Sequence, residues 1–140
     1  MNRDPEPVMH RSTVAGIGLL LALTAGPAPA AAPCDPAAPQ GRQNQCAAAA
    51  FVAESKALES AYAGYRAQLG PAQKDRLKRT QLAWLVLRDA SCDFESAGGA
   101  GGPAQGRVLS DCLSRLTRER AQALRAGAAC KAADAGCAPR

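Results

Sequence analysis

The spacing of apolar residues along the chain predicts three long helices. In the first, from about Gln43 to Leu69, large apolar side chains recur at steps of three, four and seven residues, which places them on one helix face. These residues are Phe51, Leu58, Tyr62, Tyr65 and Leu69. Gly70 and Pro71 follow at once, a pair typical of one helix ending and the next beginning. The pattern therefore predicts a tight helix–turn–helix connection.

The second predicted helix runs from about Pro71 to Ala97 and the third from about Gln105 to Ala126. Their periodic positions are Leu77, Thr80, Trp84, Leu87, Ser91 and Phe94, then Leu109, Cys112, Leu113, Leu116, Ala123 and Leu124. The run 98–103, Gly-Gly-Ala-Gly-Gly-Pro, separates them because glycine and proline are the poorest helix formers. No G-x-x-x-x-G-K-[ST] pattern and no strand precede a helix here, so a nucleotide-binding loop is excluded. Short connections favour antiparallel packing, and the fold class is all-α, a small antiparallel bundle of about three helices.

Residues 82–87 of the second helix are apolar on every side, which indicates neighbours on more than one side. A strand is the rival interpretation of this short run, and the long flanking helical period argues against it. Trp84 is the largest side chain and the expected core anchor. Arg88 is expected to pair with a carboxylate of a neighbouring helix, since partly buried arginines usually find a bidentate partner. The predicted core comprises Phe51, Leu58, Tyr62, Tyr65, Trp84, Leu87, Arg88, Leu113 and Leu116.

The first thirty residues have the layout of a secretory signal peptide. Arg3, His10 and Arg11 precede the apolar run 14–23, which is too short to span a bilayer, and small residues follow up to Ala30, the expected cleavage site. The chain is thus predicted to be periplasmic or secreted. An uncleaved anchor is one alternative, and a lipoprotein is disfavoured because Pro33 precedes Cys34 where a small residue is needed. The expected divisions are a signal peptide (1–30), an extended lead-in (31–42), a helical domain (43–126) and a tail (127–140).

All six cysteines follow the predicted cleavage site, and an even count in a small exported domain indicates disulfides. Their spacing is not C-x-x-C, which disfavours a metal site. Antiparallel packing of the second and third helices brings Cys92 beside Cys112. Locality pairs Cys34 with Cys46 and leaves Cys130 for Cys137.

Composition limits the chemistry of the predicted mature domain. The chain has 140 residues, enough for one domain, and its single histidine, His10, lies in the predicted signal peptide. We therefore expect no histidine-based catalytic site, no enzyme activity, no cofactor and no metal. Removing residues 1–30 leaves a charge of (17 − 2) − (12 − 2) = +5. Nucleic acid is not an expected partner, because only 4% of the residues are aromatic and the chain is predicted to be exported. Peripheral contact of the positively charged chain with an anionic envelope surface is expected instead.

Several motifs resemble one bacterial family. They are Asn44-Gln45-Cys46-Ala47, Gln81-Leu82-Ala83-Trp84, Arg88-Asp89-Ala90-Ser91-Cys92-Asp93-Phe94-Glu95 and Cys112-Leu113-Ser114-Arg115-Leu116-Thr117 with Arg120. In order and spacing they resemble the LprI-type lysozyme-inhibitor domain, over about Cys34 to Leu124. The resemblance implies an exported, helical, disulfide-linked protein that inhibits lysozyme. Arg42-Gln43 and Ala100 depart from the family pattern, and the Cys130/Cys137 tail lies outside it.

A binding surface is hypothesised beside the glycine-rich connector. Asp89, Asp93 and Glu95 offer negative charge next to Gly98 and Gly99, and this charge could meet the basic cleft of a lysozyme or another cell-wall hydrolase. The net charge of +5 opposes this, because long-range repulsion slows association with a basic partner. The alternative function is an envelope structural protein, or one that binds wall polymer or lipid, without inhibitory activity. The sequence pattern gives no indication of the oligomeric state.

Overall fold

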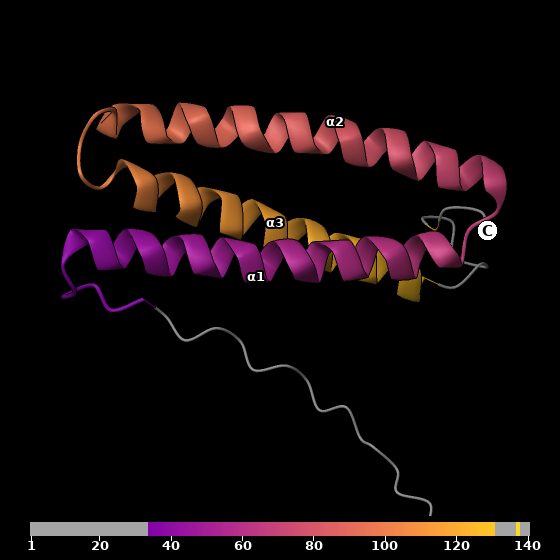
Figure 1. The fold of residues 1–140 in the computed structure, drawn as a ribbon. Helices are drawn as coiled ribbons and strands as arrows, with labels where there is room; N and C mark the ends of the chain where they lie inside the picture. Colours follow the sequence, from indigo (N-terminus) through magenta and orange to yellow (C-terminus); the bar gives the residue numbers. More distant parts are fainter. Residues whose placement is uncertain (1–33, 131–136, 138–140) are drawn as a thin grey trace, which may run out of the picture.

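The structure, a computed structural model, describes residues 34–130 and Cys137. Three α-helices are present in this part of the chain: α1 (Gln40–Ala67), α2 (Pro71–Ser96) and α3 (Gln105–Ala129). A 3₁₀ turn, η1 (Ala97–Gly99), follows α2 directly (Figure 1). The predicted all-α fold with three helices is confirmed. The predicted signal peptide lies outside the described residues.

Helix α1 begins three residues before the predicted start, so residues 40–42 do not belong to an extended lead-in. Pro39 precedes the helix with a φ of −52° and cannot donate a hydrogen bond, which suits the position before a first turn. The Gln43 amide donates to the carbonyls of Pro36 and Ala38 and holds the lead-in against that turn. Residues 127–129 likewise belong to α3 and not to the tail, since Ala128 and Ala129 favour helix.

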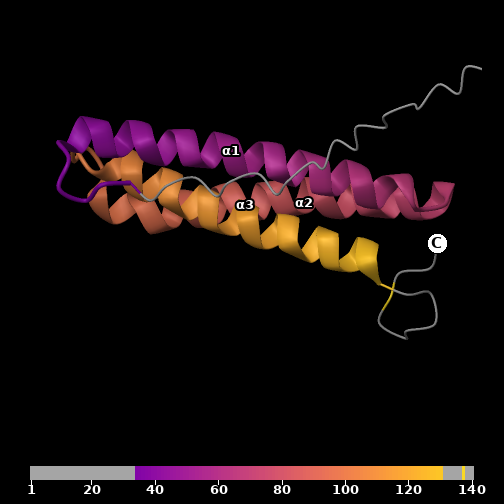
Figure 2. The ribbon, with the colours of Figure 1, turned by 90° about the horizontal axis from the view of Figure 1, so that it is seen from below.

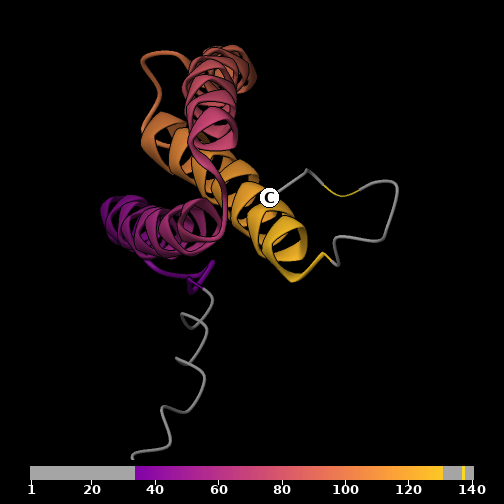
Figure 3. The ribbon, with the colours of Figure 1, turned by 90° about the vertical axis from the view of Figure 1, so that its right-hand side faces the viewer.

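The helices run alternately up and down, with α1 and α2 joined at one end of the molecule and α2 and α3 at the other (Figure 1). We call these the hinge end (residues 68–70) and the connector end (residues 97–104). Helix α3 packs along α1, and α2 packs against α3 (Figures 2 and 3). Helix α2 reaches α1 through long side chains, such as Arg88, whose guanidinium lies over the ring of Phe51. None of the helices in the described part is long and apolar enough to cross a membrane.

The hydrophobic core is a cluster of Leu58 and Ala61 from α1 with Ala121 and Leu124 from α3. The half-buried side chains of Tyr62, Tyr65, Leu77 and Trp84 pack against it. The small side chains of Ala61 and Ala121 let α1 and α3 approach closely, which compensates for the small area that each alanine buries.

Most of the predicted core residues lie inside the helix assembly. Leu58 is buried, and Phe51, Tyr62, Tyr65, Trp84, Arg88, Leu113 and Leu116 are half-buried. The prediction is wrong for Leu87, whose exposed fraction is 64%. Leu87 is not among the buried residues of α2, which are Gln81, Cys92 and Ser96, and no described residue of α1 or α3 covers its side chain. The expectation that residues 82–87 have neighbours on more than one side fails for the same reason.

Three disulfides cross-link the chain: Cys34–Cys46, Cys92–Cys112 and Cys130–Cys137. Their Cα–Cα distances are 5.8, 5.5 and 5.7 Å, all within the usual range. These are the pairs that the sequence predicts, Cys92–Cys112 from antiparallel helix packing and the other two from locality. The first ties the lead-in to α1, and the second ties α2 to α3 near the connector end.

Candidate functional site

The connector end carries a tightly turned loop, residues 97–104, which we call the connector loop. The backbone N–H of Ala100 donates to Ala97, and that of Gly102 donates to Gly99 at 2.9 Å. Gly101 has a φ of +74°, the left-handed region that glycine adopts without strain. Its N–H donates to the Gln105 side chain at 2.9 Å. These bonds give the loop a defined shape although its sequence is rich in glycine.

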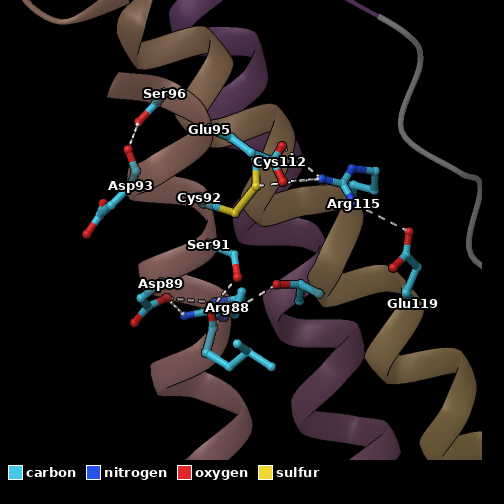
Figure 4. The surroundings of a disulfide bond; sticks show 12 residues. Arg88, Asp89, Ser91, Cys92, Asp93, Glu95, Ser96, Cys112, Arg115 and Glu119 are labelled. Carbon is cyan, nitrogen blue, oxygen red and sulfur yellow. Dashed lines mark hydrogen bonds and ion pairs between the residues drawn. A yellow bond between two sulfur atoms is a disulfide. The ribbon is translucent and has the colours of Figure 1, made fainter. Parts of the chain in front are cut away.

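Three contacts with the helices hold this loop in place. The buried Cys92–Cys112 disulfide joins the helix ends on either side of it. Arg115 donates to both carboxylate oxygens of Glu95 at 3.0 Å (Figure 4). From α1, the Asn44 amide donates to the Pro103 carbonyl at 3.0 Å. The connector loop is therefore organised before any partner arrives.

The structure does not bring the three predicted acidic residues to one surface. Glu95 faces α3 and pairs with Arg115, whereas Asp89 and Asp93 point away from the Cys92–Cys112 disulfide (Figure 4). Asp89 pairs with Arg88 at 2.6 Å, and Asp93 forms no ion pair within the described part of the chain. The local negative charge is thus largely neutralised by the chain's own arginines.

Gly98 and Gly99 are exposed and lie in the 3₁₀ turn at the start of the connector loop. A Cβ atom built at Gly98 would meet nothing within 4 Å. A side chain at this position would therefore extend into solvent and leave the fold undisturbed.

Arg88 lies at the junction of all three helices, with its side chain only 12% exposed. Its guanidinium lies 5.4 Å from the ring centres of both Phe51 and Trp84, and it donates to the fully buried Thr117 hydroxyl at 3.4 Å. Its carboxylate partner is the adjacent Asp89, so the expected pairing with a carboxylate of a neighbouring helix is wrong. The aromatic rings and the Thr117 hydroxyl supply the contacts between helices instead.

Arg120 also lies over the ring of Trp84. Its guanidinium is 5.8 Å from the Trp84 ring centre, and its Nε donates to the buried Gln81 amide oxygen at 3.0 Å. Burial lowers the pKa of the Arg120 guanidinium from its ordinary value. Arg88 and Arg120 thus hold α2 on α3 through their contacts with Trp84, Thr117 and Gln81.

A groove of about 1010 Å³ runs beside the connector end between α1 and α3. Three arginines line it, each beside a carboxylate: Arg107 with Asp111, Arg115 with Glu95, and Arg118 with Glu54. Two buried side-chain atoms of its lining residues, the Ser114 hydroxyl and the Arg107 Nε, lack a hydrogen-bond partner among the described residues. In the same part of the chain, no three His, Cys, Asp or Glu side chains gather as a metal site would require.

Sequence reasoning missed two of the contacts that hold the connector loop. The spacing of Arg115 from Asp111 and Glu119 suggests pairs within α3. In the structure Asp111 pairs with Arg107, and Arg115 approaches Glu119 only to 3.9 Å while contacting Glu95 more closely. Asn44 lies 59 residues from Pro103, and no local pattern indicates that contact.

Comparison with known proteins identifies relatives of this chain. The family model described as lysozyme inhibitor LprI matches residues 34–124. An uncharacterized protein of Rhizobium meliloti (strain 1021) is 34% identical over 77 residues, which cover 55% of this chain and 52% of the relative. The chain thus spans about half the length of that protein. The crystal structure of a DUF1311 family protein from Pseudomonas putida KT2440 matches with a TM-score of 0.60 and 27% identity, over 64% of this chain and 94% of that one.

Proposed function

The chain belongs to the LprI lysozyme-inhibitor family, and from that membership we propose that it is an exported protein that blocks a lysozyme or another cell-wall hydrolase by protein–protein contact. The family is described as lysozyme inhibitor LprI, and inhibition by protein–protein contact requires no catalytic chemistry. The proposal includes export through the signal peptide 1–30 with cleavage after Ala30.

The observation that carries the proposal is the preorganised connector loop. Hydrolases of wall polymers bind their substrates in a cleft, and the connector loop lies largely exposed at one end of the molecule, where such a cleft can receive it (Figure 1). A loop that is already held by the Cys92–Cys112 disulfide, Glu95 and Asn44 loses little conformational entropy on binding. We therefore place the inhibitory contact on Gly98, Gly99 and the adjacent Glu95.

Asp89 and Asp93 are not part of this proposed contact. The sequence suggests them for a binding surface, but they project from the side of α2 away from the disulfide (Figure 4). A partner that encloses the connector loop along α3 would not reach them.

The test is a cell-wall lysis assay with several lysozyme types and the oxidised protein. Gly98→Tyr should weaken inhibition at least about tenfold, because its side chain would obstruct the docked loop. Gly64→Tyr is the matched control: a Cβ there also meets nothing within 4 Å, but Gly64 lies near the hinge end. Full inhibition by Gly98→Tyr would exclude the loop as the contact. No protection by the wild-type protein against any lysozyme would exclude the inhibitor function.

A second candidate, contact with an anionic envelope surface, is favoured by the basic hinge end. Arg66, Lys74 and Lys78 line a groove of about 630 Å³ there, together with Tyr62 and Leu82. Such a surface attracts anionic headgroups or wall polymer, and salt screens the attraction. Binding to anionic vesicles that disappears in high salt, without binding to neutral vesicles, would support this function, and equal binding to both would contradict it.

A further inference from the structure

Helix α2 exposes a continuous apolar surface that no other described residue covers. Its large members are Leu82, Val86, Leu87 and Phe94, with exposed fractions of 54%, 71%, 64% and 83%. Ala83 and Ala90 lie between them and are exposed as well. We call these six residues the outer face of α2. A contiguous apolar surface of this kind marks an interaction site, whereas scattered apolar residues do not.

The outer face is separate from the contacts that build the fold. Gln81, Cys92 and Ser96 are the buried residues of α2, and they lie on the opposite side of the helix, toward α3. The connector loop begins only after Ser96. The outer face therefore serves neither the core nor the proposed inhibitory contact.

Charges on α2 are arranged symmetrically with opposite sign about Val86. Arg79 lies seven residues before Val86, and Asp93 lies seven residues after it. Seven residues are close to two helical turns, so these side chains belong to one stripe with Val86 between them. Neither Arg79 nor Asp93 forms an ion pair within the described part of the chain, where the ion pairs of α2 involve Arg88, Asp89 and Glu95.

We propose that the outer face of α2 binds the outer face of a second copy of this chain, with the two helices antiparallel about a two-fold axis at Val86. In this register Val86 meets the partner's Val86, and Leu82 lies opposite the partner's Ala90. Arg79 lies opposite the partner's Asp93, and the symmetry repeats that pair on the other side of the axis. A parallel arrangement would instead place like charges together, so the charges select the antiparallel one.

The sizes of the side chains suit the same arrangement. The small side chains of Ala83 and Ala90 allow two helix backbones to approach, while Leu87 and Phe94 cover the edge of the contact. The pairing leaves both connector loops free at opposite ends. Each loop begins eleven residues from the axis, so the two are separated by roughly 33 Å along the helices at 1.5 Å per residue. The dimer would thus present two inhibitory loops that face outward.

Sedimentation equilibrium of the oxidised protein tests the dimer over a range of concentrations. We expect a reversible monomer–dimer equilibrium, and Val86→Asp should raise the dimer dissociation constant at least about tenfold because it buries a charge at the axis. Val52→Asp is the matched control, since Val52 is 53% exposed but lies on α1. A wild-type protein that remains monomeric throughout, or a Val52→Asp variant that dissociates as readily as Val86→Asp, would overturn the proposal.

A charge exchange tests the register separately. Arg79→Asp alone and Asp93→Arg alone should each weaken the dimer, because each places like charges opposite one another at both junctions. The two substitutions combined in one chain restore opposite charges at both junctions, and the dissociation constant should return toward that of the wild type. If the double variant is weaker than either single variant, the antiparallel register is wrong. Lysozyme inhibition is measured separately from the dimer dissociation constant. A failure of the inhibitor proposal and a failure of the dimer proposal can therefore be told apart.

Discussion

At the scale of single residues, Arg88 shows how a cation occupies the junction of three helices. Asp89 balances its charge, the Thr117 hydroxyl accepts one hydrogen bond, and the rings of Phe51 and Trp84 lie against its guanidinium. Arginine fits this position because its planar, weakly hydrated head can stack on rings and donate at its edge at the same time. The residue therefore serves packing, and we assign it no role in partner binding.

We expect Arg88→Ala to lower the free energy of unfolding by about 1–3 kcal/mol, since it removes two ring contacts and leaves the buried Thr117 hydroxyl without its donor. Arg88→Lys should recover only part of this, because an ammonium cannot stack and donate in the same plane. Urea denaturation followed by circular dichroism measures both. Arg66→Ala, an exposed change on α1, is the control and should stay within about 0.5 kcal/mol of the wild type. Equal stability of Arg88→Ala and Arg66→Ala would contradict the packing role.

At the scale of the helices, α1 and α3 form a closely packed pair, whereas α2 depends on a few anchors. Trp84 reaches the core cluster, Arg120 and Gln81 add a hydrogen bond, and Cys92–Cys112 fixes the connector end. An element held on one face by few contacts depends strongly on each of them.

Replacing both Cys92 and Cys112 by alanine should therefore lower the free energy of unfolding by about 3 kcal/mol, the chain-entropy value for a cross-link of this span. The sequence separation is 20 residues. Hydrogen exchange should accelerate in α2 more than in α1, because α2 loses its covalent anchor. Uniform acceleration across all three helices would show that α2 is not the separately held element described here.

Two glycines inside helices allow a matched comparison. Gly64→Ala should stabilise the protein by about 0.5–1 kcal/mol, since alanine is the better helix former and the added Cβ meets nothing within 4 Å. At Gly127 the added Cβ would lie 2.9 Å from the Tyr65 ring, which packs on the core cluster. Gly127→Ala should therefore gain less stability than Gly64→Ala, or lose some. Thermal unfolding of the two variants checks the order, and the reverse order would exclude a close Gly127–Tyr65 contact.

At the scale of the whole molecule, the net charge bears on how the protein would approach the proposed partner. The predicted mature chain carries +5, and animal-type lysozymes are also basic, so their long-range interaction is repulsive. The carboxylates at the connector end do not reverse this, because Asp89 and Glu95 are paired with arginines. The proposed inhibition must then depend on close contact at the connector loop.

The association rate with a basic lysozyme should accordingly rise with added salt, because screening removes repulsion between like-charged proteins. Stopped-flow measurements across an ionic-strength series provide the test, and an acidic cell-wall hydrolase is the matched comparison, for which the rate should fall. A rate that falls with salt for the basic lysozyme would show that local negative charge controls the encounter.

The sequence by itself determined those features of the fold that depend on residues close to one another along the chain. Helical periodicity placed the three helices to within a few residues, the Gly-Pro and Gly-rich breaks placed both turns, and short separations indicated which cysteines meet. Tertiary structure alone decided which side of α2 is covered, because that depends on where α1 and α3 lie across the molecule. It exposed Leu87, gave Arg88 its aromatic contacts, separated Asp93 from Glu95, and brought Asn44 to Pro103 over 59 residues. Periodicity defines the faces of a helix, but only packing selects which of those faces is buried.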